Sequence, residues 1–106
     1  MTTSRVQSAA RVIFGPAEAI AVIAELDERF SADNPVYDGA LEPHLAERIA
    51  AAALKMSEGS LEKFGAAIKL AVKDWRDLLM AAGFGHDVSA HEAWFRQLPH
   101  QEPKVR

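Results

Sequence analysis

Hydrophobic residues recur along this chain at intervals of three and four positions, the spacing of one face of an α-helix. From about Pro16 to Phe30, apolar side chains fall on one arc and charged side chains on the other. The pattern recurs from about Pro43 to Met56 and, over the longest stretch, from Ser60 to about Ala82. No stretch alternates apolar and polar residues between turn signals, as a half-buried strand does. The pattern therefore predicts an all-α fold.

Several residues at the ends of these segments are typical of helix termini. Pro16 suits a first helical turn, where its missing N–H would be unpaired anyway. Ser60 is predicted to cap the longest helix, and Gly83 to end it in the left-handed conformation. Ser89 and Glu92 have the spacing of a capping box, which predicts a further short helix ending at Pro99.

Residues 1–15 fit two interpretations. Ser4 is a candidate cap for a short helix with Val6 and Ile13 on one side, whereas residues 11–14 also suit an extended arm. Because chain termini are the usual places for disorder, we expect residues 1–15 to form a mobile or partner-docking arm. Residues 16–98 are then a single helical domain, and residues 99–106 are a polar tail.

The connections between the helices predict an antiparallel arrangement. Asn34-Pro35 is a turn signal after the first helix, and residues 57–60 are a connection short enough to fold the next helix back. The predicted fold is a small antiparallel helical bundle with three main helices and a short C-terminal helix. Its expected core consists of the large apolar side chains on the inner arcs: Ile23, Leu26, Phe30, Leu45, Ile49, Met56, Leu61, Phe64, Ile68, Val72, Trp75, Leu79 and Trp94.

The composition suits a small globular domain and excludes several classes of function. The chain has 106 residues, 49% of them hydrophobic, and twelve Lys and Arg against fifteen Asp and Glu. The resulting net charge of −3 argues against a general nucleic-acid binder. The absence of cysteine excludes disulfides, thiolate zinc sites and iron–sulfur clusters. Because no segment resembles a signal peptide or a membrane span, we expect a cytoplasmic protein with no membrane partner. The alanine-rich composition, with twenty alanines, favours a bacterial-type protein.

Residues 45–76 imitate a DNA-reading helix–turn–helix, but their charge argues against that function. Basic residues on the third predicted helix share its outer surface with Glu62, Asp74 and Asp77. Residues 16–62 also carry ten acids against three bases, which would repel phosphate. We therefore expect no nucleic-acid partner.

His86, Asp87, His91 and Glu92 place four potential metal ligands within seven residues. Imidazole and carboxylate groups together suit divalent metals, which makes His86, Asp87 and His91 candidate ligands. The two histidines, however, are five positions apart across a turn, and Glu92 is already explained by the capping box. A polar loop followed by a helix start is the favoured interpretation.

Other polar groups also have structural explanations. Asp27 lies at the margin of an apolar arc, where a boundary carboxylate is favoured over a catalytic acid. Trp75 points along the core stripe and is interpreted as a core residue. Gly83 and Gly85 follow a helix rather than a strand, so helix termination is favoured over a phosphate-binding loop. With no Gly-x-Ser-x-Gly motif either, the sequence indicates no catalytic residue and no cofactor.

Two classes of function remain. The favoured one is a non-catalytic interaction or regulatory protein that acts through a helical surface, with an unidentified protein partner. The alternative is a small metal- or ligand-binding protein that uses the region His86–Glu92. Leu54, Leu70 and Met80 lie off the core stripes and are expected to be exposed. A straight helix from Ser60 to Ala82 would be about 34 Å long, which is too long for shorter helices to cover, so we expect a two-fold homodimer through these residues.

Overall fold

The protein is built from five α-helices within the residues that the structure describes. The computed structural model describes residues 2–29 and 43–98, and these ranges contain no strand. The helices are α1 (Ser4–Phe14), α2 (Pro16–Arg29), α3 (Pro43–Ser57), α4 (Leu61–Ala82) and α5 (Ala90–Gln97). The predicted all-α class is confirmed. Phe30, the Asn34-Pro35 turn and the tail 99–106 lie outside the described residues.

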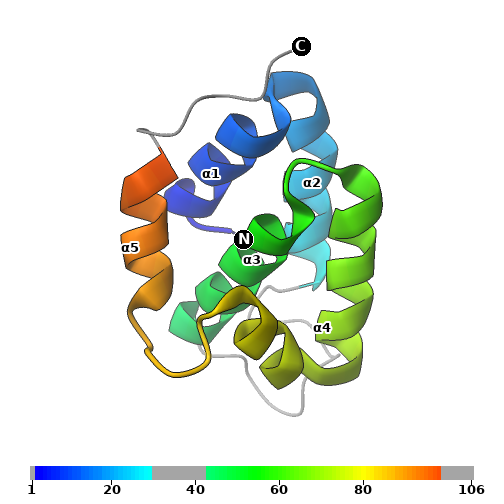
Figure 1. The fold of residues 1–106 in the computed structure, drawn as a ribbon. Helices are drawn as coiled ribbons and strands as arrows, with labels where there is room; N and C mark the ends of the chain where they lie inside the picture. The colour runs from blue at the N-terminus through cyan, green and yellow to red at the C-terminus, as the bar shows by residue number, and fades with distance from the viewer. Residues whose placement is uncertain (1, 30–42, 99–106) are drawn as a thin grey trace.

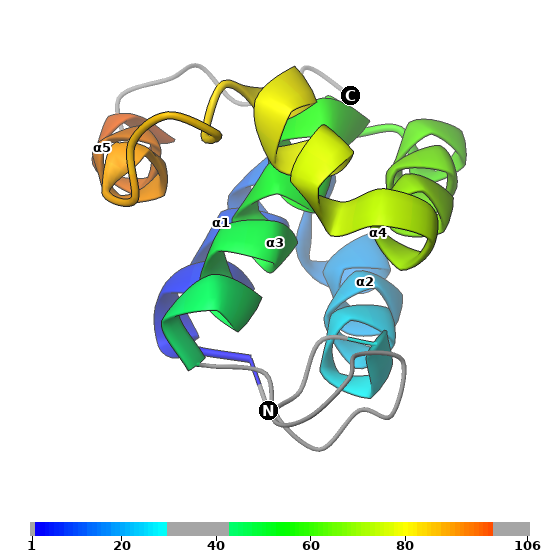
Figure 2. The ribbon, with the colours of Figure 1, turned by 90° about the horizontal axis from the view of Figure 1, so that it is seen from below.

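α3 lies at the centre of the molecule and packs against α1, α4 and α5 (Figure 1). α1 and α2 pack together as a helical hairpin. Viewed from below, α5 lies on one side of α1 and α3, and α2 and α4 lie on the other (Figure 2). No helix in the described ranges is long and apolar enough to cross a membrane.

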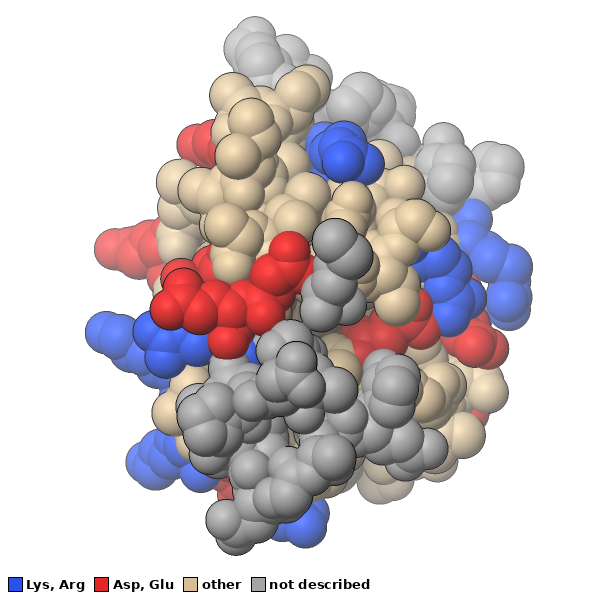
Figure 3. Space-filling model, turned by 180° about the vertical axis from the view of Figure 1, so that it is seen from behind, with Lys and Arg blue, Asp and Glu red and all other residues tan. Residues whose placement is uncertain are grey.

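The surface seen from behind has a large uncharged part (Figure 3). Charged side chains gather in a band across the middle of this face, whereas the upper part, over the corner between α1 and α2, is largely uncharged. The sequence accounts for this, because residues 16–24 contain a single charged side chain, Glu18.

α1 decides between the two interpretations of the N-terminal segment, because residues 4–14 are helical and packed. Its N-cap is Thr3 rather than Ser4, and the hydroxyl of Thr3 accepts a hydrogen bond from the backbone N–H of Val6 at 3.3 Å. Gly15 turns the chain into α2 with a φ of 84°, a conformation that favours glycine. Residues 4–14 therefore belong to the core, to which they contribute Val6, Ala9, Ala10 and Phe14.

α4 ends as predicted but is not straight. The Ser60 hydroxyl accepts a hydrogen bond from the backbone N–H of Lys63, and Gly83 is left-handed with φ 83° and ψ 16°. Between these ends, Asp74 has an extended backbone, with φ −161° and ψ 96°, and its carboxylate accepts a hydrogen bond from the Arg76 N–H. The helix is kinked there, so the expectation of one straight helix across the molecule, on which the homodimer was based, is wrong.

The kink changes which side chains are buried. Phe64 and Ile68, before the kink, are buried as predicted. After it, Leu78 is fully buried, whereas Trp75 is only half-buried beneath the Arg76 guanidinium, 4.7 Å from its ring centroid. A continuous helical spacing could not predict this, because the extended residue Asp74 resets the phase. Among the other expected core residues, Met56, Leu61 and Val72 are exposed, and Leu26, Ile49 and Leu79 are buried.

The central position of α3 also corrects the predicted interaction surface. Leu54, expected on the surface, is fully buried, as are the four alanines 50–53 that precede it. α3 has neighbours on several sides, so a residue on the far side from Leu45 is covered as well. Leu70 is half-buried against the core, and only Met80, at 53% exposure, lies on the surface as expected.

Candidate functional site

A group of polar side chains joins α1, α3 and α5. We call it the Glu47 cluster, and it consists of Thr3, Arg5, His44, Glu47, His91 and Glu92. Glu47 is its centre and is only 7% exposed. One carboxylate oxygen accepts a hydrogen bond from the Thr3 hydroxyl at 2.7 Å, and the other accepts one from Arg5 Nη2 at 2.6 Å. His91 Nε2 lies 3.1 Å from the oxygen that accepts the hydrogen bond of Arg5 Nη2.

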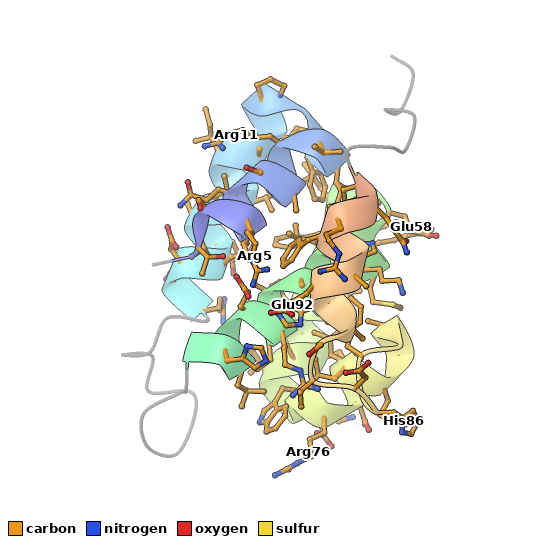
Figure 4. All side chains as sticks on the ribbon, turned by 90° about the vertical axis from the view of Figure 1, so that its left-hand side faces the viewer. Arg5, Arg11, Glu58, Arg76, His86 and Glu92 are labelled. Atoms are coloured by element: carbon orange, nitrogen blue, oxygen red, sulfur yellow. The ribbon has the colours of Figure 1, made fainter. Side chains whose placement is uncertain are left out.

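The fold brings these side chains together from distant parts of the sequence. Thr3 caps α1, Glu47 lies in the first half of α3, and His91 is the second residue of α5. Arg5 and Glu92 point toward one another from α1 and α5 (Figure 4), with Arg5 Nη2 3.6 Å from the carboxylate of Glu92. A buried carboxylate requires this kind of support, because losing water without gaining partners is costly.

The surroundings keep Glu47 ionised. Burial is the largest influence and by itself raises the pKa of Glu47, but hydrogen bonds from Thr3, Arg5 and His91 and the charge of Arg5 outweigh it. The pKa of Glu47 is therefore below its ordinary value, and the hydrogen bond with Glu47 raises the pKa of Arg5. At neutral pH the pair is an ionised carboxylate and a guanidinium.

His91 is fully buried and neutral. Burial lowers the pKa of His91, and the hydrogen bond and charge of Glu47 oppose this only in part. Because the Glu47 carboxylate can only accept, Nε2 of His91 carries the hydrogen, and Nδ1 is left as an acceptor. This Nδ1 is buried and has no hydrogen-bond partner within the described part of the chain.

The predicted metal ligands do not come together. His86 and Asp87 are exposed, and His86 lies at the lower edge of the molecule, away from Glu92 (Figure 4). Asp87 accepts a hydrogen bond from the Ser89 N–H at 2.8 Å. Instead, His44 joins His91 and Glu92, and one potential ligand atom from each lies within 4.8 Å of the others.

The predicted capping box is also wrong. Ser89 is the N-cap of α5, but its side chain makes no capping hydrogen bond, and Glu92 contacts Arg5 instead. Sequence reasoning missed His44, Glu47 and Arg5. His44 and Glu47 are three positions apart on one helix, a spacing too common on helix surfaces to indicate a site.

The carboxylate of Asp27 accepts a hydrogen bond from the backbone N–H of Thr2. This contact joins the residues just before α1 to the end of α2. Asp27 therefore has a partner outside its own helix.

Away from the Glu47 cluster, an apolar groove runs between α2 and the first half of α4 and has a volume of about 380 Å³. Its lining combines small residues, such as Ala21 and Gly65, with large ones, such as Phe64 and Ile68. Glu25 and Arg29, ion-paired at 2.7 Å, and Lys69 provide the polar part of the lining.

A second pocket, of about 290 Å³, lies between α1 and α5. Its apolar lining includes Val12, Phe95 and Leu98, and its polar lining includes Arg5 and Glu92. The pocket therefore reaches the Glu47 cluster from the surface.

Comparison of the chain with models of known protein families, with curated proteins and with solved structures finds no match.

Proposed function

We propose that this chain is a non-catalytic interaction protein, and that the groove between α2 and α4 binds an α2 helix of a second copy of the same chain. The observation that carries the proposal is that Ile20 protrudes from α2 directly beside the groove. This large apolar side chain is 73% exposed, and the next residue, Ala21, lines the groove.

α2 thus offers both halves of a self-complementary contact. In a two-fold dimer the same surface of each copy meets the other, so a protruding side chain and the hollow that receives it must lie on one patch. Ile20 is the protruding side chain, and the small residues Ala21 and Gly65 leave space in the hollow. The uncharged surface over the corner between α1 and α2 extends this patch (Figure 3).

The charges around the groove suit the rim of an interface. Glu25 and Arg29 already pair with each other, so covering the groove leaves neither of these charges without a partner. Polar rims around an apolar centre are typical of protein interfaces. Burying one isoleucine from each copy contributes about 3–6 kcal/mol, which is no larger than the cost of association, so a dimer also requires burial of the apolar lining of the groove and is expected to be weak.

The test is the mass in solution by light scattering and sedimentation, from about 10 μM to 1 mM, the range in which so weak a dimer forms. We expect the mass to rise from 11.6 kDa toward twice that value. Ile20→Glu removes the protruding side chain and should abolish the rise. Met80→Glu, at an exposed position outside the groove, is the matched control and should leave it unchanged.

A second variant tests the hollow itself. A Cβ added at Gly65 meets nothing within 4 Å, so Gly65→Leu is expected to fold normally and to fill the groove. It should weaken the dimer as strongly as Ile20→Glu does. A mass of 11.6 kDa at every concentration, or a dimer that survives both variants, would overturn the proposal.

A further inference from the structure

We propose that His44, His91 and Glu92 bind one divalent transition-metal ion, such as Zn²⁺, between the start of α3 and the start of α5. This site is separate from the groove between α2 and α4, because α1 and α3 lie between α5 and α2 (Figure 2). It also differs from the ligand set that the sequence suggested, since only His91 is common to both.

The two histidines are prepared in the same way. His44 Nε2 lies 3.0 Å from the carbonyl oxygen of Val88, and His91 Nε2 lies 3.1 Å from the carboxylate of Glu47. Both oxygens accept, so each histidine carries its hydrogen on Nε2 and presents a lone pair on Nδ1. Metal-binding histidines typically donate their other ring nitrogen to a carboxylate or a backbone carbonyl, which fixes the tautomer.

The unpartnered Nδ1 of His91 is a second, independent observation. Buried polar atoms nearly always have a hydrogen-bond partner, and an exception calls for an explanation. Nδ1 of His91 is such an atom within the described residues, and its ring lies 5.1 Å from the ring of His44, between centroids. A cation bound between the two rings would provide the missing partner.

The third ligand can move into place at little cost. Tetrahedral zinc places its ligand atoms about 3.3 Å apart, so the present limit of 4.8 Å requires a small contraction. His91 is fixed by burial, whereas His44 is exposed and Glu92 is half-exposed. Glu92 is also the looser partner of Arg5, at 3.6 Å against 2.6 Å for Glu47, so Arg5 remains paired when Glu92 turns away.

Charge and access favour a cation as well. Within the Glu47 cluster, the two carboxylates of Glu47 and Glu92 outnumber the one guanidinium of Arg5, which favours a cation there. Glu92 lines the pocket between α1 and α5 and His44 is exposed, so solvent reaches two of the three proposed ligands. Three protein ligands leave the fourth position of a tetrahedral ion for water.

The test is titration of the untagged full chain with Zn²⁺ alone by calorimetry, together with the absorption spectrum of Co²⁺ as a substitute. We expect one ion per chain and the intense visible bands of a tetrahedral Co²⁺ site. His44→Ala, at an exposed position, should weaken binding at least 10-fold and should reduce the Co²⁺ bands. Glu92→Gln should weaken it about 10-fold, the lower end of the loss that accompanies a disturbed metal site.

His86→Ala is the matched control, because His86 is an exposed histidine that lies away from the cluster. It should leave the affinity unchanged. Thermal unfolding of each variant without metal verifies that the fold is retained. Absence of stoichiometric Zn²⁺ binding, an unchanged affinity in His44→Ala, or an equal loss in His86→Ala would each overturn the proposal.

Discussion

The two halves of α3 are held by different forces. Its second half contains the buried residues 50–54, four alanines and a leucine, which pack by shape and exclusion of water. Its first half contains Glu47, whose bonds to Arg5 and His91 are directional and depend on protonation. Aromatic contacts accompany these bonds, with the rings of His91 and Phe95 5.7 Å apart.

Acid should therefore loosen the contacts of Glu47 and spare those of residues 50–54. The pKa of Glu47 is lowered, so its contribution to stability is full above its ordinary pKa of 4.5 and is lost as the pH falls through the lowered value. The pKa of His91 is also lowered, so the unfolded chain takes up its proton first. Stability therefore declines as the pH falls below the ordinary histidine value of 6.5. Residues 50–54 carry no titratable side chain.

The largest expected effect on stability is among residues 50–54 of α3. Leu54→Ala should lower the free energy of unfolding by about 3–5 kcal/mol, because it leaves a cavity beside a helix with no room to collapse. Urea unfolding at pH 7 and pH 5 should give the same loss at both. Met80→Ala, on the surface, is the control and should change stability very little. A loss for Leu54→Ala below about 1 kcal/mol would show that residues 50–54 are loosely packed.

The next largest effect on stability is expected at Glu47. Glu47→Gln keeps the shape of the side chain but removes the negative charge that pairs with Arg5. It should lower the free energy of unfolding by about 2 kcal/mol at pH 7. The loss is smaller than for a fully buried pair, because Arg5 is half-exposed and retains Glu92. As the pH falls below 4.5, where the carboxylate of Glu47 takes up a proton, the variant should lose less stability than the original chain, as urea unfolding would measure. An equal acid loss in both proteins would mean that Glu47 does not stabilise the folded state by its charge.

The smallest effect on stability is expected at an exposed ion pair whose geometry is almost the same as that of Arg5 and Glu47. Glu25 and Arg29 form an ion pair at 2.7 Å, close to the 2.6 Å between Arg5 and Glu47, but both of its side chains are partly exposed to solvent. Glu25→Gln should cost only about 0.3–0.5 kcal/mol, and 0.5 M salt should remove most of that. Thermal unfolding of Glu25→Gln and Glu47→Gln side by side measures what burial adds. Equal costs would contradict the distinction.

Sequence periodicity predicted the helices well, because it depends on local geometry. α2, α3 and α4 begin and end within a residue or two of the expected positions, and Ser60 and Gly83 terminate α4 as expected. The kink at Asp74 was missed, because an aspartate that binds the backbone N–H two residues later resembles any other helical aspartate in the sequence. The error then propagated to Trp75 and Leu78, whose burial depends on the phase after the kink.

The Glu47 cluster could not be predicted for a different reason. Its members come from α1, α3 and α5, and no local pattern links residues 42 or 44 positions apart. The exposure of Leu54 was wrong for a related reason, since it depends on how many neighbours α3 has rather than on α3 itself. In both cases the missing information was which helices meet, and the sequence contains it only as the sum of many weak contacts.

The length of the loops that the Glu47 cluster closes has a consequence for how the chain folds. The α1–α2 and α3–α4 hairpins join neighbouring segments, so they lose little chain entropy and belong to the fast, low-contact-order part of folding. The bonds from Arg5 and His91 to Glu47 close far longer stretches, and we expect them to form after the transition state. Weakening them would then speed unfolding and leave the folding rate almost unchanged. In kinetic terms the cluster acts as a latch, which determines how long the native state lasts rather than how quickly it is reached.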